Sequence, residues 1–588
     1  MGSVKIRGGV AIATVLIFGG TACGGTGEKN VFPGGGGIPV QGGVLKVVGS
    51  GDVDHLDPSS SYTTVAYNLN RTWTRQLVTY PASNDFDTAI KIVPDAAEAL
   101  PKISADGRTY TFKIRDGVLW NTSPARQVTA SDFVRGLKRL ANPVQPSGGI
   151  SYYTGTIDGM QEFFTAFQKV PKTVPAIAQF MARTPIRGVR AIDPRTLEIK
   201  LTTRASDFLN ILALPFASPA PVEYERYLPD GPDFRQHTIS LGPYRIDSYQ
   251  AGRAIVLLRN PAWKKAADSV RQQYVDRIQI TLGQDSADVV QQQLEAGTAD
   301  VSWDQPVPTS AIQRLIGDPD YHVFEGSSLN PFLVFNLQSP NNNRALANVK
   351  VRQAINFAIN KVAIAQIWGG TTLNTVLDGA VPPGSIGFDT EVRPFATPGH
   401  AGDPAKCRLM MAQAGVSNLV LQFPYRTNSN HPKVAQSIAG DLTKCGIGSN
   451  LIATAPEDFY GRYLSSVAKS REGKWDIGAP AWLPDWYGNN GRSVVVPLFD
   501  GSNYTEGSTD YGAYNNPKVN AVIAKALTAG SESEAENRWK EANAMIMADA
   551  PIVPLTSQNV PKFHSSRVRN AIYSPMSQQF DYTQLWLG

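Results

Sequence analysis

Apolar and polar positions along this chain change repeatedly between the period of a strand and the period of a helix. Residues 109–114 and 196–201 alternate with period two, as half-buried strands do. Residues 286–296 and 349–358 are instead predicted as helices, the first of them ending at Gly297. Because strands and helices follow one another in irregular order, we predict lobes of mixed α+β structure rather than a bundle or a sandwich.

Further elements follow from the same patterns and from the Gly and Pro residues between them. The helix expected over 132–140 is opened by capping residues at 129–132 and stops before Pro143. Other strands are predicted at 44–48, 242–246, 254–258, 299–303 and 552–555, and another helix at 361–368. No repeat of 20–50 residues is present, so a solenoid or propeller is not expected.

With 588 residues the chain is too long for one compact core, because single cores stop growing near about 250–300 residues. Two or three domains are therefore expected. Hydrophobic residues make up 42% of the sequence and charged residues 18%, as in an ordinary globular protein. The net charge is +5 and no dense run of Lys and Arg is present, so we expect no nucleic-acid partner.

Residues 1–22 have the order of a secretory signal peptide. Lys5 and Arg7 give a positive start, residues 10–18 are apolar, and residues 19–22 are small. An apolar run of about ten residues covers only about half of a ~30 Å hydrocarbon core, so we do not expect it to span a membrane. The pattern therefore predicts export of the protein.

The residues after the apolar run suggest a lipid anchor. Thr21-Ala22-Cys23 resembles the lipobox of bacterial lipoproteins, in which the cysteine is diacylated and becomes the new N-terminus. Gly20 departs from that pattern, which usually has Leu there; the alternative is a plain secretory signal with an incidental cysteine. Residues 23–42 are rich in Gly and have the reach of a ~25 Å tether. We expect lipidation of Cys23 and a location at the cell membrane, on its extracytoplasmic face.

Two cysteines remain in the body of the chain. In an exported protein such a pair indicates a disulfide more than a metal site. Cys407 lies in a helical pattern at 403–411, and Cys445 closes another at 434–445 with Gly446 as its stop. Two neighbouring helices would bring these thiols together, so we predict a Cys407–Cys445 disulfide.

Signatures of catalysis are missing from the sequence. It has no Gly-x-Ser-x-Gly elbow and no Gly-x-x-x-x-Gly-Lys-[Ser/Thr] phosphate loop. The six histidines are scattered, with no metal-ligand spacing. We therefore expect a binding protein rather than an enzyme, with no cofactor and no metal.

Five distinctive segments follow one another in a fixed order. They are Leu56-Asp57-Pro58, residues 94–120, residues 129–133, Gly242-Pro243-Tyr244 with residues 258–261, and residues 351–359. In these segments the chain resembles the solute-binding proteins of oligopeptide and dipeptide ABC transporters, family 5. The resemblance extends over nearly the whole mature chain.

This resemblance implies an α/β fold with mixed α+β lobes: a two-lobed, periplasmic-binding-protein-like fold (type II, cluster C) with an extra domain and a hinged ligand cleft. Lobe I would comprise residues 43–65, 215–325 and 553–588, the extra domain residues 66–214, and lobe II residues 326–552. Hinge closure of such lobes is stabilised by the difference in ligand affinity between open and closed forms. The implied partners are a peptide and the permease subunits of an ABC transporter, and a monomer is expected.

One loop carries the residues that the resemblance assigns to the ligand. Trp482-Leu483-Pro484-Asp485 matches a family pattern in which the aspartate pairs with the α-ammonium of the ligand, and Trp486 and Tyr487 follow. A carboxylate in a closed site gives a charge-assisted bond to an ammonium, and aromatic rings add cation–π attraction. The alternative is that Trp482 and Trp486 belong to the core and Asp485 is a solvated turn residue. Asn489-Asn490-Gly491 replaces the usual Asp-Pro, so we expect a loop of a different shape from that of the family.

The opposite end of a peptide requires a cation. Dipeptide binders of the family place an arginine at the turn before the helix that ends here at Cys445, and this turn contains Arg426 and Asn428. Arg426 is the candidate partner of the ligand carboxylate, and a solvent-facing arginine is the alternative. Longer peptides would rely on backbone hydrogen bonds instead.

The predicted function is capture of peptides and their delivery to a membrane permease. Two alternatives stay open: the same fold binding a nickel complex, a sugar or haem, and a peptide-sensing lipoprotein without transport. Asp485 favours a ligand that carries an amine.

Overall fold

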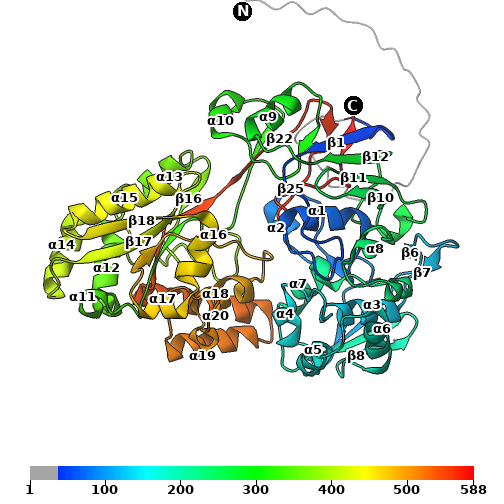
Figure 1. The fold of residues 1–588 in the computed structure, drawn as a ribbon, viewed down its shortest axis with the longest axis horizontal. Helices are drawn as coiled ribbons and strands as arrows, with labels where there is room; N and C mark the ends of the chain where they lie inside the picture. Colours follow the sequence, from blue (N-terminus) through cyan, green and yellow to red (C-terminus); the bar gives the residue numbers. More distant parts are fainter. Residues whose placement is uncertain (1–36) are drawn as a thin grey trace, which may run out of the picture.

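The computed structural model describes residues 37–588, except for the side chains of Glu457 and Asn503 (Figure 1). The predicted signal peptide, Cys23 and most of the Gly-rich tether lie outside the described residues. The described chain forms two lobes and an extra domain of mixed α and β structure, as the sequence predicts.

Lobe I is built on a five-stranded mixed sheet in the order β10-β11-β12-β1-β13. β1 pairs in parallel with β12 and β13, whereas β11 is antiparallel to β10 and β12. The alternation in β1 buries Leu45 and Val47 in a core with Trp303. The strands are β1 (Val44–Val48), β10 (Tyr244–Gln250), β11 (Ala254–Arg259), β12 (Arg277–Thr281) and β13 (Val301–Ser302).

Helix α1 (Thr64–Trp73) belongs to this lobe in the structure. Its buried Leu69 and Trp73 pack into the lobe I core beside β10, together with Phe580 and Tyr582 from the C-terminal segment. The C-terminal strands lie next to β1 in Figure 1. The predicted boundary at residue 66 therefore falls too early, because the apolar face of α1 is covered by the lobe I sheet.

The extra domain contains an antiparallel sheet in the order β4-β5-β9-β8. Gly107 (φ +69°) lies in the turn between β4 and β5. Helix α3 begins one residue after Thr129, whose backbone N–H donates to the Asp132 carboxylate at 2.9 Å. The elements are β4 (Lys102–Ile103), β5 (Thr109–Lys113), β8 (Val189–Asp193), β9 (Thr196–Lys200), α3 (Ala130–Arg139), α4 (Ile150–Thr154), α5 (Met160–Phe167), α6 (Val174–Arg183) and α7 (Phe208–Ala213).

Lobe II combines a small antiparallel sheet, β19-β15-β20, with the parallel pair β17-β18 and a surrounding set of helices. The strands are β15 (Phe332–Phe335), β17 (Val420–Arg426), β18 (Gly448–Thr454), β19 (Ile477–Gly478) and β20 (Ile552–Pro554). The main helices are α12 (Val349–Ala358), α13 (Lys361–Ile367), α14 (Pro404–Gln413), α15 (His431–Lys444), α18 (Gly491–Phe499), α19 (Pro517–Leu527) and α20 (Glu532–Asp549).

A disulfide joins two of these helices. Cys407 lies in α14 and Cys445 directly follows α15, with their Cα atoms 5.7 Å apart. Both cysteines are buried in a lobe II core that also contains α12 and β17. The pair is the one that the helical patterns suggested.

Two long segments run between the lobes. β14 (Tyr321–Phe324) and β22 (Val560–Phe563) pair antiparallel at the crossing, and the strand leading into β22 is visible in Figure 1 as a diagonal red ribbon. Before β22, β20 pairs with β15, and β21 (Thr556–Gln558) pairs with β16 (Asn374–Val376). The return to lobe I therefore occurs near residue 560 instead of 553, because residues 552–558 hydrogen-bond to lobe II strands.

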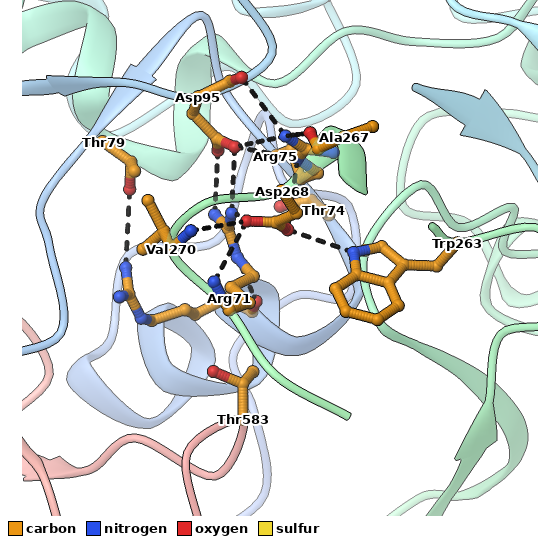
Figure 2. Close-up of polar contacts among 12 residues, drawn as sticks. Arg71, Thr74, Arg75, Thr79, Asp95, Trp263, Ala267, Asp268, Val270 and Thr583 are labelled. Carbon is orange, nitrogen blue, oxygen red and sulfur yellow. Dashed lines mark hydrogen bonds and ion pairs between the residues drawn. The ribbon is translucent and has the colours of Figure 1, made fainter. Parts of the chain in front are cut away.

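A buried cluster of four charged residues joins the extra domain to lobe I (Figure 2). Arg271 donates from both Nη atoms to the two carboxylate oxygens of Asp95, at 3.0 Å each. Arg75 contacts Asp95 at 2.8 Å and Asp268 at 3.5 Å, and the Trp263 indole donates to Asp268 at 3.1 Å. None of the four charged side chains is more than 1% exposed. Burial alone would raise the pKa of Asp268, but Arg75 and Arg271 hold it well below its usual range.

Within residues 37–588, no helix combines the length and the apolar character needed to cross a bilayer.

Candidate ligand-binding site

A cavity of about 440 Å³ lies where the two lobes meet the crossing strands. Its volume falls in the range typical of small-molecule sites, about 300–1,000 Å³. Lobe I, lobe II and β22 all contribute to its wall. The lining residues are Thr64, Val65, Asp304, Pro306, Ser328, Asn330, Ala481, Trp482, Leu483, Gln558, Asn559, Val560, Pro561, Lys562, Gln578 and Gln579.

Apolar, amide, hydroxyl and charged side chains make up this wall. Apolar surface comes mainly from Val65, Trp482 and Leu483, and Leu483 is 39% exposed. Five amide side chains supply both hydrogen-bond donors and acceptors; they are Asn330, Gln558, Asn559, Gln578 and Gln579. One carboxylate, Asp304, and one ammonium, Lys562, complete the lining. Such a wall can bind a polar ligand that carries apolar groups.

Asp485 lies two residues beyond the cavity wall at Leu483, where lobe II meets the rest of the molecule. The Tyr62 hydroxyl of lobe I donates to its Oδ1 at 2.8 Å, and the Tyr152 hydroxyl of α4 donates to its Oδ2. Its own backbone N–H donates to Ser493 Oγ at 2.6 Å, which ties the loop to α18. In the described part of the chain, no basic side chain forms an ion pair with Asp485.

The electrostatics of this contact follow from burial. Burial raises the pKa of Asp485, and the two tyrosine hydroxyls oppose that rise by donating to the carboxylate. Burial also raises the pKa of Tyr62 and of Tyr152, and the neighbouring carboxylate raises both further. The tyrosines therefore stay neutral donors. Two hydrogen bonds leave lone pairs on both carboxylate oxygens, so Asp485 can still accept bonds from a cation.

The three aromatic residues predicted for the ligand differ in position. Trp482 lines the cavity, and its indole N–H donates to the Ser493 carbonyl at 2.7 Å. Trp486 is completely buried in the core of the extra domain, edge-on to Tyr152 at 4.9 Å between ring centroids. Tyr487 is 3% exposed. Trp486 and Tyr487 therefore anchor the loop by packing, as in the core alternative, and present no open ring face to the cavity.

Arg426 and Asn428 lie outside the cavity wall. Arg426, near the end of β17, has its guanidinium carbon 5.1 Å from the Phe459 ring centroid and donates to the Ala479 carbonyl at 3.3 Å. Burial lowers the pKa of Arg426. Asn428 is exposed on the turn after β17. A ligand would have to extend beyond the cavity to reach either residue.

Several residues of the site escape prediction from sequence. Tyr62 and Tyr152 lie 423 and 333 residues before Asp485, so no local pattern links them to it. An ion pair also joins α18 of lobe II to the extra domain, because Arg492 donates to Asp207 at 2.7 and 3.1 Å. Lys562 is a lone lysine in a strand, and only the crossing of β22 brings it to the cavity.

Among residues 37–588, no group of three or more His, Cys, Asp or Glu side chains is arranged to hold a metal ion.

The family can now be identified. A model described as "Bacterial extracellular solute-binding proteins, family 5 Middle" matches residues 91–505. The chain belongs to this family. "Heme-binding protein A" of Haemophilus influenzae is 26% identical over 510 residues, covering 84% of this chain and 83% of that protein. The "Dipeptide-binding protein" of Escherichia coli is 24% identical over 512 residues, covering 83% and 85%.

A solved structure supports the same fold for this family 5 protein. "Clavulanic acid biosynthesis oligopeptide binding protein 2" superposes with a TM-score of 0.82 at 24% identity, over 93% of this chain and 96% of that one. The chain is therefore a family 5 solute-binding protein with the two-lobed fold. The names of these relatives refer to haem, dipeptides and oligopeptides, so membership of family 5 does not by itself define the solute.

Proposed function

We propose that this family 5 protein captures peptides with a free amino terminus between its lobes and delivers them to the permease of an ABC transporter. Asp485 is the observation that carries the proposal. It is a half-buried carboxylate at the lobe interface that accepts only neutral donors and has no ion-pair partner among the described side chains. An ammonium would supply the missing positive charge.

The cavity, whose wall ends at Leu483 two residues before Asp485, suits peptides of varied sequence. Amide side chains in the cavity can pair with successive peptide groups, and the apolar wall at Val65, Trp482 and Leu483 accepts varied side chains. Two relatives named for dipeptides and oligopeptides support this choice. Lipidation of Cys23 would keep the protein at the extracytoplasmic face of the membrane, next to its permease.

Closure of the cleft is coupled to the same carboxylate. Tyr62 and Tyr152 belong to lobe I and the extra domain, whereas Asp485 belongs to lobe II. Separating the lobes breaks both hydrogen bonds and leaves the carboxylate to water. A ligand ammonium at Asp485 adds a bond that is strongest when the site is closed and dry, so it shifts the population toward the closed form.

Calorimetric titration with alanine peptides of two to five residues tests this proposal. We expect at least one length to bind, and its N-acetylated form to bind at least about tenfold more weakly, because acetylation removes the ammonium. Equal affinity for both forms would show that Asp485 does not bind an amino terminus.

Haem serves as the competing ligand in the same assay, because one relative is named for it. Binding of haem without binding of any peptide would replace the peptide assignment. Peptide uptake by cells that lack the protein, with and without its restoration, distinguishes transport from sensing. If uptake is unchanged while peptides bind, the transport part of the proposal is wrong.

A further inference from the structure

We propose that Lys562 is an anion-binding residue of the cleft and takes a carboxylate of the ligand, at the opposite end from the group that binds Asp485. The inference rests on the proposed function for the ligand being a peptide. It assigns a role that the sequence pattern had given to Arg426.

Lys562 is placed by the crossing of the chain between the lobes. It lies in β22, opposite His322 of β14, and it is among the residues that line the cavity. Its side chain is nine-tenths buried, with 7% of the residue exposed. The ammonium donates one hydrogen bond, to Gln579 Oε1 at 2.9 Å. An ammonium has three donors, so two of them have no acceptor among residues 37–588.

No carboxylate of the described chain neutralises this ammonium by direct contact. Asp304 also lines the cavity and attracts the charge from a distance. Its two oxygens, however, accept backbone N–H groups of Ser50 and Gly51 at 2.8 and 2.7 Å, which hold it to the loop after β1. A buried cation without a contact partner is unfavourable, so an anion that enters the cavity gains a strong interaction.

The pKa of Lys562 in the ligand-free protein agrees with this geometry. Burial lowers the pKa of Lys562 to about 7, although the field of Asp304 raises it. A carboxylate at hydrogen-bond distance would raise that pKa again, so the lysine would take up a proton when the ligand binds.

Arg426 is less suited to the same role. Its guanidinium is already packed against the rings of Phe459 and Tyr460, and it does not line the cavity. Gln578 and Gln579 lie beside Lys562 in the wall and offer amide donors to a second carboxylate oxygen. A zwitterionic ligand with its ammonium toward Asp485 and its carboxylate toward Lys562 would meet opposite charges at both ends.

The test uses three forms of one alanine peptide, with free ends, with a C-terminal amide, and with an N-terminal acetyl group. Affinities are measured by calorimetry for the natural protein and for Lys562→Met. The natural protein should bind the free acid about 10–100-fold more tightly than the amide, as expected for a charge-assisted hydrogen bond. Lys562→Met should remove this ratio. The exposed lysine of lobe II at position 350 provides the control, and Lys350→Met should keep the ratio.

Each outcome bears on one claim. If Lys562→Met keeps the preference for the free acid, or if the natural protein has none, the assignment of Lys562 is wrong. If the acetylated form binds as well as the free form and its binding requires Lys562, the anion site stands and the ammonium site at Asp485 is wrong. If none of the three forms binds, both assignments are wrong. Use of a ratio keeps the result independent of any general loss of folding in a variant.

Discussion

Two groups of charged residues in this protein lie at junctions between its domains. The charges of one group are paired with each other, whereas those of the other group are not. Where the extra domain meets lobe I, Asp95 and Asp268 are paired with Arg75 and Arg271 in a sealed cluster (Figure 2). At the cleft, the side chain of Asp485 accepts hydrogen bonds from tyrosine hydroxyls and Lys562 donates to an amide. The first group is neutral within the protein, whereas neither charge of the second has a contact partner of opposite sign in the described part of the chain.

This difference in charge pairing distinguishes a permanent junction from one that opens. A sealed cluster loses several kcal/mol when one partner is removed, so it holds its two domains together whether or not a ligand is present. Charges left without partners favour a molecule that brings the opposite charges, and the closed form becomes favoured only with that molecule. We therefore expect closure of the cleft to depend on a ligand, and the junction at the cluster to be independent of it.

The largest effect is expected in the sealed cluster. Asp95→Asn leaves Arg75 and Arg271 without their shared carboxylate, and we expect the free energy of unfolding to fall by about 3–5 kcal/mol. Urea unfolding measures this change. Glu295→Gln, which removes the exposed pair with Arg314, is the control and should cost about 0.2–1 kcal/mol. Equal losses in the two variants would contradict the distinction between sealed and exposed pairs.

The ion pair between Asp207 and Arg492 is intermediate between the sealed cluster and the cleft. It joins α18 of lobe II to the extra domain, and both of its charges belong to the protein. Asp207→Asn should weaken closure by about 1–3 kcal/mol, the usual worth of a hydrogen bond to a charged group. Free and N-acetylated peptides should lose affinity by the same factor, since this pair does not touch the ligand. A selective loss for the free form, measured by calorimetry, would place Asp207 in ligand recognition instead.

Sequence patterns predicted the order of elements well, because most strands and helices bury one face and show it locally. Residues 109–114, 196–201 and 349–358 lie in the elements expected for them, within a residue or two. The boundaries of the lobes were less predictable. They depend on contacts between segments far apart in the chain. Such contacts decide which sheet covers α1 and which strands pair with residues 552–558.

The candidate site also combines residues with a local sequence signal and residues without one. Trp482 and Asp485 were predicted for the site because they share a four-residue pattern, but that pattern does not distinguish a residue that lines the cavity from a core residue such as Trp486. Tyr62, Tyr152 and Lys562 have no local signal, since each reaches the site only through the tertiary fold.

A further effect concerns pH. Lys562 has a pKa of about 7, below its usual value, so it is charged below pH 7 and progressively neutral above it. Affinity for the N-acetylated peptide, which has no titrating amine, should therefore be highest below pH 7 and fall by up to about tenfold per pH unit above it. Titrations between pH 6 and 9 measure this fall, and Lys562→Met should give a flat profile. A fall that persists in Lys562→Met would assign it to another group.

The neighbours of Lys562 do not obscure this profile. His322 lies in β14, opposite Lys562, and burial together with His564 lowers its pKa to about 4, so it is neutral throughout the range. Burial also lowers the pKa of His564, which directly follows β22. Asp304 is a carboxylate held by two backbone N–H groups. Lys562 is then the group whose charge changes between pH 6 and 9.

The most direct test of the comparison is to measure ligand affinity and unfolding free energy together in Asp485→Asn. Asparagine keeps the size of the side chain and can still exchange hydrogen bonds with Tyr62 and Tyr152, but it has no charge for an ammonium. We predict that affinity for a peptide with a free amino terminus falls by about 10–100-fold, while the free energy of unfolding changes by less than about 1 kcal/mol. Unchanged affinity, or a loss of stability as large as that of Asp95→Asn, would contradict the claim that Asp485 is held for the ligand.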